Sequence, residues 1–136
     1  NIVMENKIIY NKEFKNKIKD LVIKDEEVII EFEDGGVLLE SYHNQDCCEN
    51  VYADFSIMKY YKERLVDKEL KDLTIKSVKD MGFLLCFNCG YDNEKVFIPC
   101  YNSQNGYYSS DLELHITEGE VTTKIDISDL VEDDID

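Results

Sequence analysis

Pairs of strand-like segments, each joined by a short turn, constrain the fold of this chain more than any other feature of its sequence. The clearest pair is 28–33 and 37–42, in which aliphatic residues flank Asp34, Gly35 and Gly36. Glycines in such a turn supply the positive φ angles that a tight hairpin needs. We therefore predict an antiparallel hairpin over these two segments.

Two further hairpins are predicted later in the chain. GFLLCFNCG and EKVFIPCYN lie on either side of the turn at 91–93, and DLELHIT and EVTTKIDI lie on either side of Glu118-Gly119. The alternation of apolar and polar residues in the last pair indicates strands with one buried and one wet face. The segment 72–80 alternates in a similar way and is predicted to be a strand.

One amphipathic helix is predicted over 53–65. Phe55, Met58 and Leu65 recur in it at spacings typical of one helix face, and Asp54 is available as its N-cap. Together these patterns predict an α+β domain, made of a mostly antiparallel sheet built from hairpins and one central helix. They leave room for a second, short helix near the N-terminus.

The chain length of 136 residues fits one domain. We expect a single ligand-binding domain over 1–128, followed by an acidic tail over 129–136. No apolar run reaches the roughly 18 residues that a membrane helix needs, and no export signal is recognised. We therefore expect a cytoplasmic protein with no membrane partner.

The charge balance is strongly acidic, with 30 acidic against 15 basic residues and a net charge of −15. Binding to nucleic acid through its phosphates needs a basic face, so we expect no nucleic-acid partner. A small protein this acidic is either simply well solvated or imitates a polyanion in order to occupy a nucleic-acid-binding protein.

Five cysteines are an odd number, and without an export signal they are expected to be reduced. Cys86 and Cys89 form a CxxC motif inside an apolar run, whereas redox CxxC motifs normally open a helix and zinc needs a second ligand pair. Zinc and redox chemistry stay open, but structural cysteines fit better, and the adjacent Cys47 and Cys48 are expected to fill gaps at a corner. We expect neither a metal nor a cofactor.

The two histidines do not indicate catalysis. His43 and His115 are far apart in sequence, and no glycine elbow or helix start accompanies a pair such as Cys48 and His43. We expect ordinary hydrogen-bonded histidines and no enzymatic activity.

A second distinctive stretch is YNSQNGYYSSDL, residues 101–112. Asn105-Gly106 is a strong turn signal, and tyrosines and serines surround it. Tyrosine offers a flat face and a hydroxyl group. The stretch therefore fits a hairpin turn packed on the sheet or the wall of a pocket.

DCCENVYADF and NGYYSSDL, taken together, resemble a family of small phage and prophage proteins. The shared pattern is a hairpin with DGG, a CCE-x-V-Y corner and an NGYYS turn. It is matched here by Phe32, Asp34, Gly35, Gly36, Cys47, Cys48, Glu49, Val51, Tyr52 and residues 105–109. Within that group, the chain is similar to the Thoeris anti-defence sponge proteins.

The resemblance implies a function and an assembly. Those proteins are phage-encoded binders that sequester the cyclic ADP-ribose isomer made by bacterial TIR-domain sensors, without degrading it. They form homo-oligomers built from dimers, with ligand pockets at the subunit interface. The chain is thereby expected to bind a small cyclic nucleotide and to assemble with copies of itself.

A binder of such a ligand needs aromatic faces for adenine, polar groups for its edges and cations for its phosphates. The candidates are aromatic, amide and basic residues near the motifs: Phe83, Phe87, Asn93, Asn105, Tyr107, Tyr108, Arg64 and Lys24. The alternative function is that of an acidic protein–protein inhibitor, a DNA mimic of the anti-CRISPR kind that blocks a bacterial defence protein.

Overall fold

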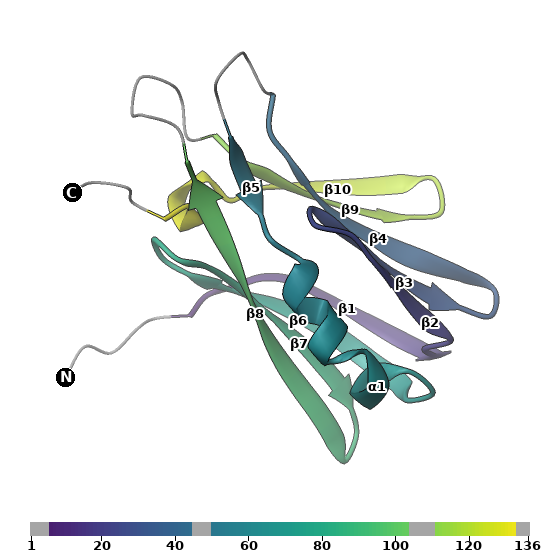
Figure 1. Ribbon diagram of the computed structural model, residues 1–136. Helices are drawn as coiled ribbons and strands as arrows, with labels where there is room; N and C mark the ends of the chain where they lie inside the picture. The colour runs from purple at the N-terminus through teal and green to yellow at the C-terminus, as the bar shows by residue number, and fades with distance from the viewer. Residues whose placement is uncertain (1–5, 45–49, 104–110, 133–136) are drawn as a thin grey trace.

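Two five-stranded antiparallel sheets face each other in the computed structural model, which describes residues 6–44, 50–103 and 111–132 (Figure 1). Sheet A contains, in spatial order, β1 (Ile8–Lys17), β6 (Glu69–Val78), β7 (Gly82–Cys89), β8 (Asp92–Asn102) and β5 (Val51–Ala53). Sheet B contains β10 (Val121–Asp126), β9 (Glu113–Glu118), β4 (Gly35–Tyr42), β3 (Glu27–Phe32) and β2 (Asp20–Ile23). The expected sheet-rich antiparallel fold is confirmed, as a sandwich of two sheets.

The three predicted hairpins are present as β3–β4, β7–β8 and β9–β10. In the first, Phe32 pairs with Gly35, so Glu33 and Asp34 form the two-residue turn, slightly earlier than expected. Gly35 follows this turn with a φ of 140°, a conformation that side chains other than hydrogen rarely allow. Gly35 thus provides the backbone conformation that the chain needs where it leaves the turn and enters β4.

The core lies between the two sheets, because alternate residues of each strand point inward. In β3, Val28, Ile30 and Phe32 are buried while the residues between them are partly exposed. Segment 54–61 adds Phe55, whose ring centre lies 6.0 Å from that of Phe83 in β7. Burying large apolar side chains from both sheets is the main favourable term in the stability of such a sandwich.

The predicted helix over 53–65 is replaced by a strand and two short helical turns. Ala53 ends β5, and η1 (Ser56–Tyr60) and α1 (Lys62–Leu65) follow. The Asp54 carboxylate accepts a hydrogen bond from the Ser56 N–H at 2.9 Å and so starts the first turn. The periodicity placed Met58 and Leu65 in the core correctly. However, the strand at 51–53 depends on pairing with β8, which local spacing cannot reveal.

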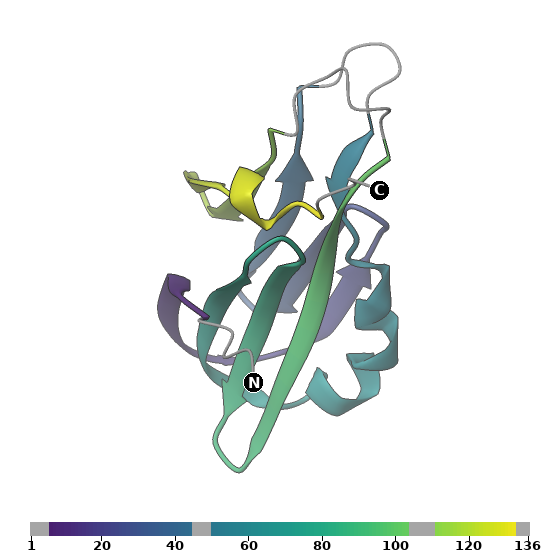
Figure 2. The same cartoon turned by 90° about the vertical axis from the view of Figure 1, so that its left-hand side faces the viewer.

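The short N-terminal helix is absent from the described residues, where 8–17 form β1 and pair with β6. Both ribbon views place η1 and α1 along one side of the sandwich, beside β8 and near β2 (Figure 2). No helix among the described residues combines the length and apolar character needed to cross a bilayer.

The packed body extends beyond the expected boundary at residue 128. Leu130 and Val131 are buried after the short helical turn η2 (Ser128–Leu130), and the Glu132 N–H donates to the Cys100 carbonyl at 2.8 Å. The hydrogen bond ties Glu132 to β8, and the two apolar residues belong to the core. The rest of the expected tail, 133–136, lies outside the described residues.

Candidate functional site

Residues 59–64 present two tyrosines, two lysines and an arginine on the helical segment that closes one side of the sandwich. Met58 and Leu65 are fully buried and anchor the two ends of this run. Because the backbone turns between them, Tyr60 and Lys62 project outward and the Tyr60 side chain remains 67% exposed. The run thus combines an exposed aromatic ring, three basic residues and Glu63 in a chain with a net charge of −15.

A hollow of about 690 Å³ lies along this segment. It is lined by Asp20, Lys59, Tyr60, Lys62, Glu63, Val66 and Asp67. The Lys59 ammonium group lies 5.2 Å from the centre of the Tyr60 ring, and the Lys62 Nζ lies 3.2 Å from an Asp20 carboxylate oxygen. The volume is within the range of roughly 300–1,000 Å³ found for small-molecule sites. The hollow therefore has room for a ligand of nucleotide size and presents to it a flat ring and two lysines, together with the three carboxylates of Asp20, Glu63 and Asp67.

Asp20 fixes the position of Lys62. Its carboxylate accepts a hydrogen bond from the Leu21 N–H at 2.8 Å and contacts Lys62, and these two interactions hold its pKa below the usual value. The carboxylate is therefore ionised near neutral pH. Asp20 both orients the Lys62 ammonium group and partly cancels its charge at the hollow.

Arg64, the predicted phosphate ligand, faces β8 instead of the hollow. Its guanidinium group lies 4.9 Å from the Tyr61 ring centre and 3.4 Å from a Glu94 carboxylate oxygen. Asn93, another predicted site residue, is the neighbour of Glu94, and its side-chain oxygen accepts the Cys89 N–H at 3.1 Å. Arg64 and Asn93 thus lie at the same end of sheet A, with the Asn93 oxygen engaged within the β7–β8 turn.

The remaining predicted site residues do not join this group. Lys24 lies between β2 and β3, with its Nζ 3.9 Å from Glu27, and does not line the hollow. Phe83 and Phe87, expected to stack on a ligand, are buried in the core, where their rings are not exposed in this fold. Asn105, Tyr107 and Tyr108 lie outside the described residues.

The sequence reasoning missed Tyr60 and Lys62 as site residues. Both occur in KYYK, where two adjacent tyrosines on a helical segment cannot both face one core, and basic residues flank them. That pattern could have identified an exposed ring between cations. Asp20 could not have been found, because it lies 42 residues before Lys62 and meets it only through the packing of η1, which precedes α1, against β2.

A second hollow, of about 330 Å³, lies at the other end of sheet B. It is lined by Tyr42, His43, Asn44, Asp111, Leu112, Glu113, Asp126 and Ser128. Three of these eight residues are acidic, and no lysine or arginine occurs among the described residues that line it. This electrostatic environment opposes the binding of phosphates.

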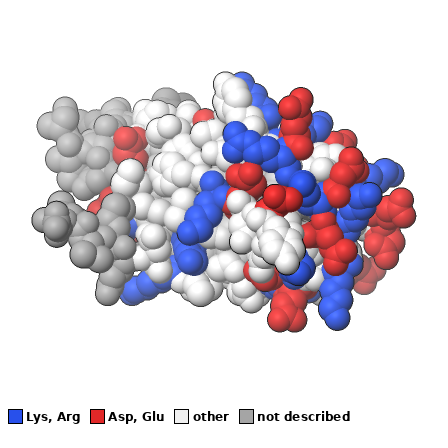
Figure 3. All heavy atoms as spheres, turned by 90° about the horizontal axis from the view of Figure 1, so that it is seen from below, with Lys and Arg blue, Asp and Glu red and all other residues white. Residues whose placement is uncertain are grey.

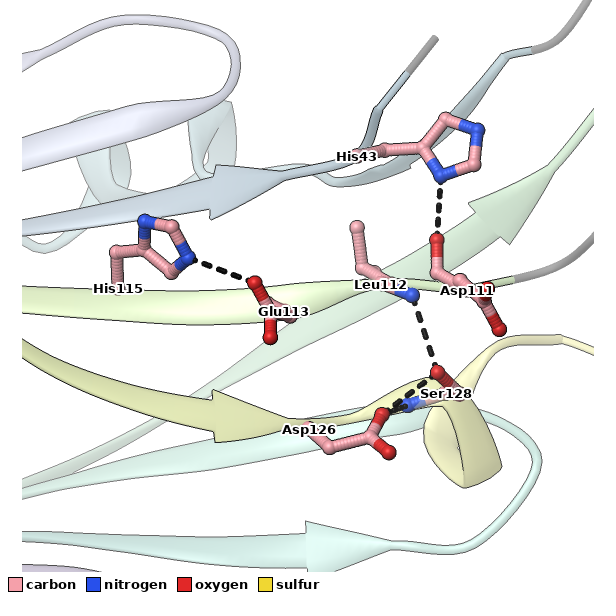
Figure 4. A network of polar contacts seen from close by, with 7 residues as sticks. All are labelled: His43, Asp111, Leu112, Glu113, His115, Asp126 and Ser128. Carbon is pink, nitrogen blue, oxygen red and sulfur yellow. Dashed lines mark hydrogen bonds and ion pairs between the residues drawn. The ribbon is translucent and has the colours of Figure 1, made fainter.

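Hydrogen bonds within the protein organise this second hollow (Figure 4). The buried His115 ring stacks on Tyr42 at 4.7 Å between centres, and its Nε2 lies 3.0 Å from Glu113. Asp126 accepts hydrogen bonds from the N–H and the hydroxyl group of Ser128, which lower the pKa of Asp126. These contacts give His115, Glu113 and Asp126 hydrogen-bond partners within the protein.

The described residues that flank the two motif segments meet near this hollow. The Ser103 N–H donates to the Asn50 carbonyl at 3.0 Å, and the His43 Nδ1 contacts the carbonyl of Asp111. The residues on either side of segments 45–49 and 104–110 are therefore in mutual contact. These two segments contain most of the residues on which the family resemblance rests. The segments themselves are outside the described part of the chain.

Of the three described cysteines, Cys100 is buried and Cys86 and Cys89 are partly exposed. Cys86 and Cys89 lie three residues apart in β7, so they point to opposite faces of sheet A. Cys100 is buried, and burial raises the pKa of its thiol to about 12. Within the described ranges, no three histidine, cysteine or acidic side chains are grouped closely enough to hold a metal ion.

No protein-family model, no curated protein and no solved structure matches this chain.

Proposed function

We propose that the chain is a phage-encoded anti-defence protein that binds and sequesters a cyclic ADP-ribose-type nucleotide of TIR-based immunity without degrading it. The proposal is supported by the resemblance of the three short motifs and by the hollow at Tyr60. The observation that carries it is the exposed Tyr60 ring, which shares the hollow with Lys59 and Lys62 in a chain of net charge −15.

The chemistry of this hollow matches the parts of such a nucleotide. An adenine base stacked on an aromatic side chain contributes about 1–3 kcal/mol. The ammonium groups of Lys59 and Lys62 are placed to approach the phosphates, where local cations act whatever the net charge of the protein. The two other acidic residues of the hollow, Glu63 and Asp67, offer acceptors for ribose hydroxyl groups and for an exocyclic amine.

Sequestration requires tighter binding than one open hollow provides. A Kd of 1 nM corresponds to about −12 kcal/mol, well beyond one stacked base and two exposed ion pairs. The resemblance implies pockets at a subunit interface, and a second subunit over this hollow would enclose more of the ligand. The homo-oligomer is thus part of the proposed function.

The experiment that tests the proposal is capture and release. The purified protein is incubated with the product of an NAD-consuming TIR enzyme, washed by filtration and denatured by heat, and the filtrate is analysed by mass spectrometry. We expect the intact cyclic nucleotide in about equal amount to protein chains. Tyr91→Ala, which removes a fully exposed tyrosine at the β7–β8 turn, is the matched control for Tyr60→Ala.

Two results would contradict the proposal in this experiment. The first is a filtrate without nucleotide from the wild-type protein. The second is a linear or hydrolysed product that accumulates beyond one equivalent per chain, because it would indicate turnover.

The outer face of sheet B favours a second candidate, the acidic inhibitor of a nucleic-acid-binding protein. Glu27 of β3 and Glu40 of β4 are directly opposite each other, and Glu31 and Glu113 share this face. Like charges in directly opposed positions are destabilising, and Lys24, whose Nζ lies 3.9 Å from Glu27, offsets part of this repulsion. A salt-sensitive loss of DNA binding by a defence protein, abolished by Glu27→Gln with Glu40→Gln, would support this candidate.

A further inference from the structure

The two sheets have four edge strands, and three of these are protected against pairing with other chains. β1 carries Lys12, Lys15 and Lys17, and its pairing with β6 contains two register shifts. Figure 3, which views the molecule from the side of sheet A, shows many basic groups among the acidic ones. β5 is only three residues long, and β2 has four residues and lies beside η1. Lysines, irregular pairing, short length and a covering segment are devices by which natural sheets protect their edges.

β10, the remaining edge strand, lacks these devices. It is six residues long, pairs with β9 without a register shift, and contains no proline and a single lysine. Residues 121–124 are all exposed, so both faces of the strand reach solvent over this run. β10 forms the margin of sheet B in Figure 1. A regular, exposed edge of this kind is a template for pairing with another extended segment.

The register of the β9–β10 hairpin shows which backbone groups face the open edge. Glu118 and Val121 flank the two-residue turn, so they form a hydrogen-bonded pair, and the bonded positions alternate from there along β10. The Ile127 N–H, which donates to the Leu112 carbonyl at 2.9 Å, continues the same alternation. The odd-numbered residues of β10 therefore bond to β9, and the even-numbered residues present their N–H and C=O groups to the open edge.

Thr122 and Lys124 are the exposed residues of this even-numbered set. In the described part of the chain, no backbone hydrogen bond joins either of them to a further segment. Their side chains lie on the outer face of sheet B, where Lys124 is opposite His115. Val121 and Ile125 lie on the other face, and Val121 is 69% exposed. A segment paired here would thus have a polar neighbourhood on one face and an apolar one on the other.

The charge around β10 favours a basic partner. Residues 113–130 contain five acidic residues and one lysine. Lys12 of β1 forms an ion pair with Glu118 and offsets one of these negative charges. The other four carboxylates still outnumber Lys124, and they belong to Glu113, Glu120, Asp126 and Asp129. Complementary charge of this kind selects partners and speeds their association.

We propose that β10 is a docking edge for an extended, basic segment of another protein, which adds a further strand to sheet B. In such strand addition, main-chain hydrogen bonds give the affinity, and side chains at alternate positions give the specificity. The backbone groups of Thr122 and Lys124 supply the hydrogen bonds, and Val121 and Ile125 contact apolar residues of the partner. The inference concerns a different surface from the Tyr60 hollow and does not depend on a nucleotide.

The test uses a short peptide with capped ends, in which lysine alternates with valine, and the full chain labelled with nitrogen-15. Binding is measured by calorimetry, and amide exchange is followed by NMR. We expect the amides of Thr122 and Lys124 to become protected on binding, whereas Thr123 and Ile125, which already bond to β9, should stay unchanged. The same peptide with glutamate in place of lysine should bind at least about tenfold more weakly.

Two substitutions of Lys124 separate the backbone from the side chain. Lys124→Pro removes an N–H that faces the open edge, where an edge strand tolerates proline, and should weaken peptide binding at least about tenfold. Lys124→Ala is the matched control, because it keeps the N–H and should bind at least as tightly as the wild type. Circular dichroism shows whether both variants fold, and if Lys124→Pro does not, the amide pattern of the wild type decides.

Three results would overturn the proposal. The first is the absence of saturable peptide binding by the wild-type protein, or binding without protection of the Thr122 and Lys124 amides. The second is unchanged binding by a folded Lys124→Pro variant, because charge attraction alone would then hold the peptide. The third is protection of these amides in the free protein that grows with protein concentration, which would show that a second copy of the chain occupies the edge.

Discussion

The carboxylate of Asp20 holds the ammonium group of Lys62 at 3.2 Å, although the two residues belong to different elements, β2 and α1. This contact places a cation on one wall of the Tyr60 hollow and a competing anion beside it. The two charges should therefore act in opposite directions on a ligand that carries phosphates.

We expect Lys62→Ala to weaken nucleotide binding and Asp20→Asn to strengthen it, each by about two- to fivefold, because both charges are exposed and screened by water. Calorimetric titrations in low and in 0.5 M salt measure both effects. Added salt should diminish each of them. A change in the same direction for both variants would show that the hollow does not hold the phosphates.

Asp126 provides a pH-dependent prediction. The hydroxyl group and N–H of Ser128 lower the pKa of Asp126 in the folded state below 3.8. A depressed pKa gives stability that is complete above the unfolded pKa and is lost as the pH falls through the folded pKa. Asp126→Asn should therefore lower the urea midpoint at pH 7 more than at pH 3. Equal shifts at both pH values would contradict this role.

Phe87 distinguishes a core position from a binding position. Its ring is buried between the sheets, so Phe87→Leu should lower the free energy of unfolding by about 1–2 kcal/mol. The nucleotide affinity of the folded protein should stay at the wild-type value. A variant with unchanged stability and lost binding would show that Phe87 belongs to the ligand site and would contradict its role in the core.

The thiols should differ in reactivity according to their burial. Cys100 is buried and its pKa is raised to about 12, so almost no thiolate exists at pH 8. Cys86 is only partly buried, and desolvation raises its pKa less. Alkylation of the native protein followed by peptide mapping should label Cys86 well before Cys100. Labelling of Cys100 at the rate of Cys86 would show that β8 opens readily.

Local signals predicted the hairpins because their information lies within a few residues. Alternation along each strand and the turn residues between them, such as Gly35 after Glu33-Asp34, are sufficient to define an antiparallel pair. The same signals could not predict how hairpins combine. β1 pairs with β6 more than fifty residues away, and β5 pairs with β8, so neither strand is visible as local periodicity.

The site was harder to predict than the fold, because one apolar pattern fits two roles. Phe83 and Phe87 recur on one face of β7, a pattern that fits rings stacked on a ligand, yet the same pattern buries them when a second sheet covers β7. For the basic residues, the charge could be predicted from the sequence, but the direction of the side chain could not. Arg64 was predicted to bind phosphate, but its side chain is directed to Glu94 by contacts that only the folded chain contains.

The central claim is that the exposed Tyr60 ring stacks on the base of a sequestered cyclic nucleotide. Calorimetric titration of the purified cyclic ADP-ribose isomer into wild-type protein, Tyr60→Ala and the control Tyr91→Ala tests it most directly. We predict tight binding by the wild type and the control, and at least about tenfold weaker binding by Tyr60→Ala, the loss expected for one stacked base. Absence of binding by the wild type, or wild-type affinity in a folded Tyr60→Ala variant, would contradict it.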